Sequence, residues 1–212
     1  MFEDRIDAAQ RLAEALKEYA GPDTVVLGIP RGGVIVGEVV ARTLGVPLDV
    51  VVPRKVGAPG NPELGLGAVA PGVRVLDQWL IERLGVSEQY LEREIAAEEA
   101  ETVRRLRAYR GDRPPLDLTG KTAIVVDDGV ATGGTAVAAL RWARAQGAEK
   151  VVLAVPVAPP QTMQRLSHEA DEVVALATPE PFFAVGEWYR IFDQTSDEEV
   201  LAALARAGGE PA

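Results

Sequence analysis

Short runs of β-branched and apolar residues alternate with segments of helical periodicity along most of this chain. The runs end in turns rich in glycine or proline, and the segments between them repeat apolar residues every three or four positions. Strands separated by helices of this length form a parallel sheet with helices on both faces. The sequence therefore predicts an α/β fold, with strands at 24–30, 48–53, 122–127, 151–155 and 172–176, and helices at 6–19, 34–45, 136–146 and 161–169.

Three segments do not follow this alternation. Residues 54–72 are rich in glycine and proline, and apart from a hairpin that 66–69 and 73–75 can form, they are expected to be a flexible lid. Residues 87–110 predict one long charged helix, with apolar Leu91, Ile95, Val103 and Leu106, that serves packing or self-association into a homodimer. Residues 178–194 hold five of the eleven aromatic side chains. Residues 196–199 form a capping-box pattern that starts a last helix, followed by a frayed tail at 208–212.

We expect one domain over residues 1–212, with a core at about 22–177, the lid at about 54–72 and a small hood at about 178–195. The 22 basic and 32 acidic residues give a net charge of −10, which argues against nucleic acid and anionic membranes as partners. No secretory leader or bilayer-length apolar run is seen, so a cytoplasmic protein is expected. Arginine outnumbers lysine and Asn61 is the single asparagine, a pattern that fits a thermophile or a GC-rich genome equally.

The absence of cysteine excludes disulfides, thiolate metal sites and thiol nucleophiles. Neither the GxSxG nor the HExxH pattern occurs, which argues against hydrolase triads and zinc proteases. His168 lies at the end of a predicted helix, where it favours the helix dipole, and we expect no catalytic role for it. Catalysis by a classical nucleophile is therefore not expected.

The segment from Ile124 to Thr135 carries the sharpest chemical signal. An apolar strand ends in Asp127 and Asp128, and a turn of small residues then enters a helix. Successive backbone N–H groups at a helix start bind anions, and the hydroxyls of Thr132 and Thr135 can donate to a phosphate monoester. Two carboxylates at a strand end suit the vicinal hydroxyls of a ribose, directly or through hydrated Mg²⁺. These residues predict a ribose 5-phosphate site.

Other phosphate-binding motifs do not fit this segment. A Walker A loop requires Gly-Lys-Ser/Thr, and Gly134 stands where the lysine would be. The Rossmann fingerprint is missing from the strand–helix turns, and the fragment from Gly65 to Gly67 lies inside the expected lid. The remaining alternative is a pair of solvated aspartates at an ordinary strand end.

The 124–135 segment closely resembles the ribose-phosphate motif of the type I phosphoribosyltransferases, and the resemblance extends over about residues 22–195. It implies transfer of ribose 5-phosphate from phosphoribosyl pyrophosphate (PRPP) to a nitrogenous base, or the reverse, with Mg²⁺. The implied donor site uses the acidic pair Asp127 and Asp128 for catalysis and for metal binding, the latter directly or through water. The implied 5-phosphate loop is Ala131, Thr132, Gly133, Gly134 and Thr135.

The resemblance also assigns the rest of the site. The turn after the first strand would bind pyrophosphate with Arg31, Gly32 and Gly33. Arg54 and Lys55 would lie at the base of a catalytic lid over the leaving diphosphate. Phe183 would stack on the base and Ala184 would read its edge, although these hood aromatics can equally be packing residues.

Two departures leave the acceptor base open. Oxopurine-salvage enzymes carry an aspartate where this chain has Ala131, and a lysine after the next strand that residues 155–158 do not supply. A second hypothesis is a non-catalytic regulator of the same fold that binds PRPP or a nucleotide. A third is a subunit that works only inside a complex, which the charged 87–110 helix would support.

Overall fold

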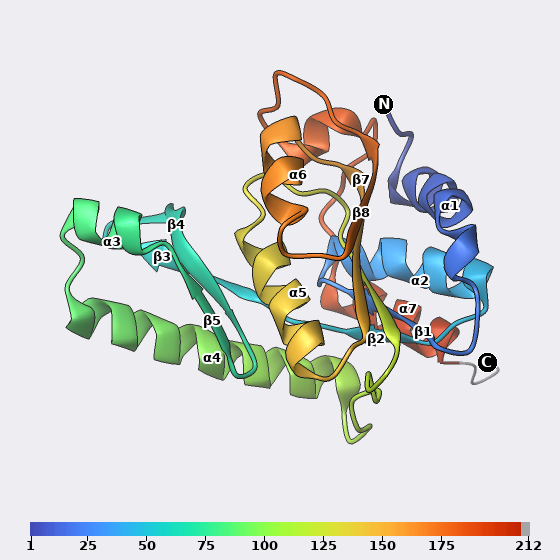
Figure 1. Cartoon of the computed structure of the whole chain (residues 1–212), viewed down its shortest axis with the longest axis horizontal. Helices are drawn as coiled ribbons and strands as arrows, with labels where there is room; N and C mark the ends of the chain where they lie inside the picture. Colours follow the sequence, from blue (N-terminus) through green and yellow to red (C-terminus); the bar gives the residue numbers. More distant parts are fainter. Residues whose placement is uncertain (209–212) are drawn as a thin grey trace.

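The computed structural model describes residues 1–208; residues 209–212, within the expected tail, lie outside the described residues. Five parallel strands form the central sheet in the order β2-β1-β6-β7-β8. Figure 1 shows this sheet between the helices of the body. This arrangement confirms the predicted α/β class. The strands are β1 (Thr24–Gly28), β2 (Leu48–Val50), β6 (Thr122–Val126), β7 (Lys150–Val157) and β8 (Glu172–Ala177).

Helices cover both faces of this sheet because successive strand side chains point to opposite sides. In β1, Val25 and Leu27 pack under α5 and α6, whereas Val26 packs under α1 and α2. The same alternation in β6 divides Val125 from Ile124. The helices of the two layers are α1 (Arg5–Ala15) and α2 (Gly32–Leu44) on one face, and α5 (Gly134–Ala145) and α6 (Pro160–Leu166) on the other.

The remaining elements close the edges of this body. A 3₁₀ turn, η1 (Lys17–Tyr19), follows α1, and α7 (Asp197–Ala207) packs beside α2 and β2. The capping box predicted for α7 is confirmed: Ser196 Oγ accepts from the Glu199 amide, and the Glu199 carboxylate accepts from the Ser196 amide. No helix among residues 1–208 combines the length and the apolar character needed to cross a bilayer.

Residues 54–72 do not form the irregular loop that we expected. They form β3 (Arg54–Ala58) and β4 (Asn61–Ala70), which join β5 (Val73–Leu76) in a separate antiparallel sheet. The hairpin between 66–69 and 73–75 is confirmed, since Val69 pairs with Arg74. Glycines suggested a loop, but at Gly67 the strand itself requires one: its φ is +154° and a Cβ there would collide with the Val75 carbonyl.

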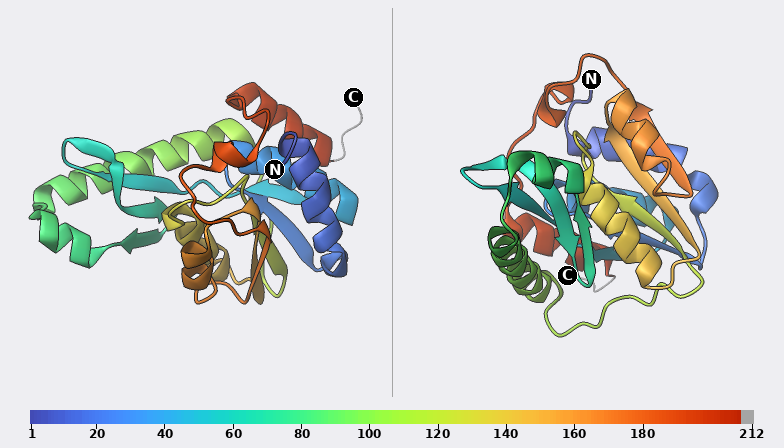
Figure 2. Two further views of the ribbon diagram at one scale, coloured as in Figure 1. Left: turned by 90° about the horizontal axis from the view of Figure 1, so that it is seen from above. Right: turned by 60° about the vertical axis from the view of Figure 1, so that its left-hand side comes forward.

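This small sheet, α3 (Gln78–Leu84) and the first half of α4 (Glu88–Arg110) form an arm that projects from the body (Figures 1 and 2). The arm has its own apolar core, which includes Val56, Leu66 and Ile95. The long helix predicted at 87–110 is confirmed as α4. The predicted apolar positions of this helix are only partly right. Val103, one of them, is 64% exposed, and Tyr109, which was not among them, is buried.

The C-terminal end of α4 joins the arm to the body. The Tyr109 hydroxyl donates to Asp197 Oδ1 at 2.6 Å. The Arg110 guanidinium donates to both carboxylate oxygens of Asp49 at 3.2 and 3.0 Å. The helix therefore spans from the arm to β2 and α7.

The hood (residues 178–195) has little regular structure beyond η2 (Val185–Trp188). It is held by the first residues of the chain: the Phe2 amide donates to the Trp188 carbonyl at 2.7 Å, and the Arg190 amide donates to the Phe2 carbonyl at 2.9 Å. The rings of Phe2 and Tyr189 pack with their centroids 5.4 Å apart, and both residues are buried. The N-terminal segment thus forms one unit with the hood.

Candidate active site

The order of the parallel strands fixes where a ligand can bind. After β1 the chain crosses to β2 on one side, and after β6 it crosses to β7 on the other. Where the connections after two neighbouring parallel strands lead to opposite sides of the sheet, a crevice forms at the carboxyl ends of these strands. Ligands bind in this crevice in open α/β sheets. Gly28 pairs with Val126 at the ends of these two strands. The turns after β1 and β6 therefore lie side by side.

The loop at 131–135, which we call the phosphate loop, leads from β6 into the start of α5. Within residues 1–208, no protein group accepts a hydrogen bond from the amides of Thr132, Gly133, Gly134 or Thr135. Gly133 has φ +76°, a left-handed conformation that glycine adopts without strain. A row of free amides at the N-terminus of a twelve-residue helix can bind an anion.

The turn after β1 offers a second set of free donors. Among the described residues the Arg31 side chain has no ion-pair or hydrogen-bond partner, and it is exposed. Gly32 and Gly33 let this turn lie directly against the acidic pair. A Cβ on Gly32 would collide with the Asp128 carboxylate, and one on Gly33 would lie 2.8 Å from the Asp127 Cα.

The two aspartates lie in different environments. Asp128 Oδ2 accepts from Arg5 Nε at 2.7 Å, and the Tyr189 hydroxyl donates to the Asp128 carbonyl. The Arg5 guanidinium also lies 4.0 Å from the centre of the Phe192 ring. Asp127 Oδ1 accepts from the Asp128 amide at 2.9 Å, and no group in the described part of the chain donates to Asp127 Oδ2.

These environments have electrostatic consequences. Burial, followed by the neighbouring charge of Asp128, raises the pKa of Asp127 well above its usual value. Burial is also the main cause of the raised pKa of the Tyr189 hydroxyl, which keeps it a hydrogen-bond donor. Asp127 is thus the carboxyl group left available to a ligand, whereas the Asp128 carboxylate is engaged by Arg5.

The acidic pair fits Mg²⁺ in one limited way. Residues 1–208 contain no group of three or more His, Cys, Asp or Glu side chains placed so that they could hold a metal ion, so the protein alone offers no complete cage. Mg²⁺ typically keeps several waters and is held by one or two carboxylates together with substrate phosphates. Asp127 Oδ2 and a bound diphosphate would provide such a ligand set.

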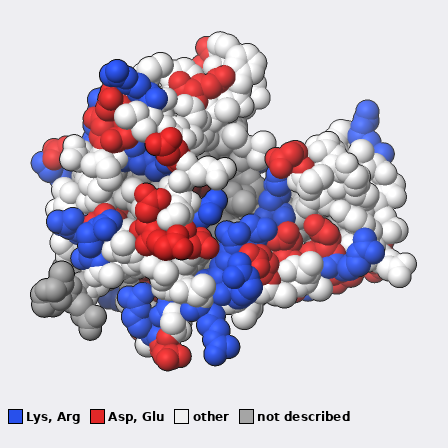
Figure 3. Space-filling model, turned by 180° about the vertical axis from the view of Figure 1, so that it is seen from behind, with Lys and Arg blue, Asp and Glu red and all other residues white. Residues whose placement is uncertain are grey.

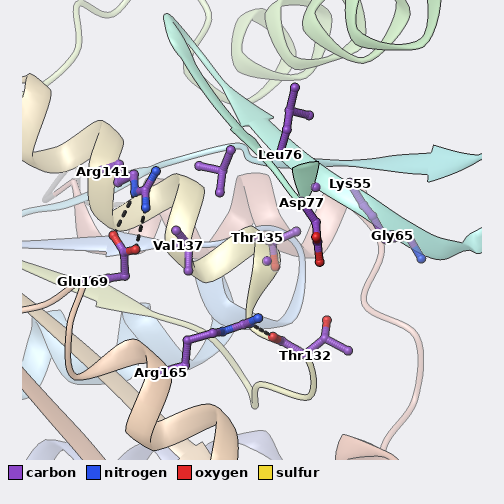
Figure 4. Close-up of a pocket in the computed structure, with 13 residues that line it drawn as sticks. Lys55, Gly65, Leu76, Asp77, Thr132, Thr135, Val137, Arg141, Arg165 and Glu169 are labelled. Carbon is purple, nitrogen blue, oxygen red and sulfur yellow. Dashed lines mark hydrogen bonds and ion pairs between the residues drawn. The ribbon is translucent and has the colours of Figure 1, made fainter. Parts of the chain in front are cut away.

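A cleft of about 380 Å³ adjoins the phosphate loop. Figure 4 shows it between the arm, on which Lys55 and Asp77 lie, and α5 and α6 of the body. Lys55 lines this cleft together with Thr132 and Thr135. Arg54, the second expected lid cation, instead donates to Glu98 on α4 at 2.7 Å. Lys55 thus lines the same cleft as the phosphate loop, with its Nζ paired to Glu63 Oε2 at 3.2 Å, whereas Arg54 is directed into the arm.

The residues expected to bind a base lie on the hood. Phe183 is 78% exposed and Ala184 is also exposed, and neither lines the cleft. The neighbouring Phe182 packs against Trp188 with ring centroids 6.3 Å apart. Val185 lies against Gly129, where an added Cβ would collide with it. The hood therefore contacts the turn after β6 and leaves the Phe183 ring open to solvent.

Sequence reasoning did not find three residues that contact these turns. Arg5 comes from the first helix, 123 positions before its partner Asp128. Thr162 and Arg165 come from α6: the Thr162 hydroxyl donates to the Ala131 carbonyl at 2.6 Å, and Arg165 donates to the Thr132 carbonyl. Only the tertiary fold brings these side chains to the site, and no local pattern marks them.

Comparisons with known proteins agree with this geometry. The family model for the phosphoribosyl transferase domain matches residues 2–189. A protein of Mycobacterium tuberculosis H37Rv, provisionally named a phosphoribosyl transferase, is 49% identical over 208 residues, which is 98% of this chain and 47% of that protein. The chain thus spans about half the length of the curated relatives that match nearly all of its sequence.

Two further similarities are structural or more local. A crystal structure of a Thermus thermophilus protein is 48% identical, covers 96% of this chain and 97% of its own, and superposes with a TM-score of 0.80. A uracil phosphoribosyltransferase of Campylobacter jejuni is 39% identical over 59 residues, 28% of each chain. The family match covers most of the sequence and both turns described above. The chain therefore belongs to the phosphoribosyl transferase domain family.

Proposed function

We propose that this protein transfers ribose 5-phosphate from PRPP to a nitrogenous base with release of pyrophosphate, or catalyses the reverse reaction, in the presence of Mg²⁺. The observation that carries the proposal is the pair of adjoining turns with free backbone amides, one after β1 and one after β6. Asp127 lies between them with one carboxylate oxygen free of protein donors in the described chain. Two anion sites flanking a carboxylate match the 5-phosphate, the diphosphate and the ribose of PRPP.

Different residues would bind the different parts of PRPP. The phosphate loop would bind the 5-phosphate through its amides and the hydroxyls of Thr132 and Thr135. Asp127 would accept from the ribose hydroxyls, while Arg31 and the amides of Gly32 and Gly33 would bind the diphosphate. Bound Mg²⁺ would neutralise charge on that leaving group.

Catalysis would then follow from stabilising the departing diphosphate. The bond between C1 of the ribose and the diphosphate oxygen breaks, and a nitrogen of the base forms the new bond to C1. Fixed donors that face the developing negative charge lower the barrier without reorganising. Lys55 would add a cation from the arm, whereas Arg54, bound to Glu98, would hold the arm in shape.

The acceptor would lie under the hood, with Phe183 stacking on it and Ala184 reading an edge through its backbone. Exposure of Phe183 supports this assignment, because a large ring at 78% exposure contributes little to the core of the hood. Uracil belongs among the first bases to test, since a uracil phosphoribosyltransferase shares a 59-residue match with the chain.

The test is pyrophosphate release from PRPP and Mg²⁺ with a panel of purine and pyrimidine bases. We expect release that depends on one base and is lost in Arg31→Ala. A protein that binds PRPP but releases no pyrophosphate with any base would instead be the non-catalytic regulator. Failure to bind PRPP at all would contradict both functions.

A further inference from the structure

We propose that Thr162 and Arg165 of α6 are positioning residues for the 5-phosphate: they hold two carbonyls of the phosphate loop so that its amides face the ligand. The proposal rests on the proposed function, because it assumes that this loop binds the phosphate of PRPP. Figure 4 shows the Arg165 side chain reaching from α6 to Thr132.

The two contacts act on successive peptide groups. The Thr162 hydroxyl donates to the Ala131 carbonyl at 2.6 Å, and the Arg165 guanidinium donates to the next carbonyl, that of Thr132. Neither peptide bond is among the cis bonds of the chain, and in a planar trans peptide the C=O and the following N–H point in opposite directions. The carbonyls turned toward α6 therefore turn the amides of Thr132 and Gly133 away from it. These are two of the four amides that donate to no protein group in residues 1–208.

Gly133 shows how closely the loop lies against α6. A Cβ on this buried residue would lie 3.0 Å from Arg165 Nη2 and 3.0 Å from Thr162 Cγ2. Its φ of +76° belongs to the left-handed region. A loop of small residues has little rigidity of its own, so the two side chains from α6 are what limits its rotation on that side.

Arg165 also leaves positive charge beside the loop. Both oxygens of the nearby Glu169 accept from Arg141, at 2.8 and 2.6 Å. Arg165 forms no ion pair within the described residues. Its charge therefore remains available to favour an anion bound at the amides it orients.

The contacts are separate from what holds α6 in place. Leu166 is fully buried in the core beneath the helix, together with side chains of α5 and the sheet. Thr162→Val keeps the shape of the side chain and removes only the hydroxyl donor. Arg165→Gln removes the charge at an exposed position. Both variants should fold.

The experiment compares binding of two ligands that share one site but use different turns. Ribose 5-phosphate and Mg²⁺-pyrophosphate are titrated separately by calorimetry into the wild-type protein, Thr162→Val, Arg165→Gln and Arg165→Lys. Arg144→Gln is the matched control, because Arg144 pairs with Asp171 away from the loop. Melting temperatures of all five proteins show that each is folded.

We expect Thr162→Val to weaken ribose 5-phosphate binding about fivefold and Arg165→Gln about tenfold. Arg165→Lys should recover part of the loss, because it keeps a charged donor. Pyrophosphate affinity should stay unchanged in every variant, which a general structural defect would not allow.

Wild-type affinity for ribose 5-phosphate in both Thr162→Val and Arg165→Gln would overturn the positioning role while leaving the proposed function intact. Equal losses for ribose 5-phosphate and pyrophosphate would also overturn it, because the effect would not be confined to the loop. A wild-type protein that binds neither ribose 5-phosphate nor PRPP would overturn the proposed function and this inference together.

Discussion

Asp127 and Asp128 are chemically identical neighbours, yet the structure gives them opposite relations to the stability of the fold. Asp128 is ion-paired with Arg5 at 2.7 Å, with side chains 15% and 14% exposed. Asp127 is partly buried beside that charge and has a raised pKa, first because of burial and then because of the neighbouring carboxylate. An aspartate with a raised pKa costs stability when ionised, whereas an ion-paired one contributes to it.

Asp127→Asn is therefore expected to raise the melting temperature at pH 7 while weakening PRPP binding about tenfold to a hundredfold. The sign follows from linkage: a carboxyl group whose folded pKa exceeds its unfolded pKa makes the protein less stable as pH rises through the folded value. The gain in melting temperature should thus disappear at acidic pH. Thermal melts at several pH values and PRPP calorimetry measure both effects, and a destabilised Asp127→Asn would contradict this electrostatic assignment.

Asp128→Asn should have the opposite effect on stability. Removing the carboxylate charge removes the ion pair of Arg5 Nε, so we expect the melting temperature to fall by about 2–6 °C. Arg5→Gln should cause at least as large a fall, because it also removes the hydrogen bond to the Asp193 carbonyl at 2.8 Å, and the double variant should fall no further than Arg5→Gln. Additive losses in this cycle would show that Arg5 and Asp128 do not act as a pair.

The sequence predicted the residues of this site better than their partners. A strand followed by two acids and a loop of small residues is a local pattern, so Asp127 and the phosphate loop could be read from it. Arg5, Thr162 and Arg165 could not, because each is an ordinary residue of a helix until the fold brings it to the turn. The unequal environments of Asp127 and Asp128 depend on those contacts, so the sequence could not predict them either.

Among the elements, the arm was predicted wrongly from the sequence: residues 54–72 were expected to be a flexible lid and instead contain strands β3 and β4. Gly57, Gly65, Gly67 and Pro62 are typical of loops, yet they lie in β3 and β4, whose register shifts at Val56 and Gly57. The strands are stabilised by backbone pairing and by apolar contacts with α4, which comes later in the chain. Local composition cannot reveal a hairpin that depends on a later helix.

The two cations at the start of β3 should behave differently on substitution. Lys55→Ala should weaken PRPP binding or slow turnover, because Lys55 lines the cleft. It should change stability little, because the ion pair that it removes, with Glu63, is exposed. Arg54→Ala should lower stability by up to about 1 kcal/mol through loss of the Glu98 pair and speed hydrogen exchange in the arm. Activity assays and hydrogen exchange separate the two, and the reverse pattern would show that Arg54 is the lid cation.

Helices α2 and α7 are joined by a buried charge. Burial raises the pKa of Glu38, but hydrogen bonds from Arg206 and then Arg42 outweigh it, so the pKa lies below its usual value. A lowered carboxyl pKa contributes stability above the unfolded pKa that is lost as pH falls through the folded value. Glu38→Gln should therefore cost about 1–3 kcal/mol near pH 7, and the cost should shrink as the pH falls below the usual carboxyl pKa. Denaturant unfolding at neutral and acidic pH tests this, and a cost independent of pH would contradict it.

For the whole molecule, strand order and charge distribution matter more than any single contact. The connections after the parallel strands β1 and β6 lead to opposite sides of the sheet, which brings the two turns that we propose to bind anions together. Figure 3 shows basic and acidic side chains interspersed over the face that it displays, arm included. The net charge of −10 is therefore compatible with local binding of a polyanion such as PRPP.

Self-association through α4 stays a prediction. Ile95 and Leu91, part of the apolar set that suggested a homodimer, pack within the arm itself. Val103, which is 64% exposed, remains for a partner. Sedimentation velocity should show a dimer that Val103→Glu dissociates, and a monomer at all concentrations would contradict this surface.

The central claim, that the turns after β1 and β6 form a PRPP site, is tested most directly by calorimetric titration of PRPP with and without Mg²⁺. We predict saturable binding at one site per chain that strengthens with Mg²⁺. Binding should be lost in Gly32→Val, where a side chain would meet the Asp128 carboxylate, provided that this variant retains a cooperative melt. Absence of binding under both conditions, or undiminished binding to a folded Gly32→Val protein, would contradict the claim.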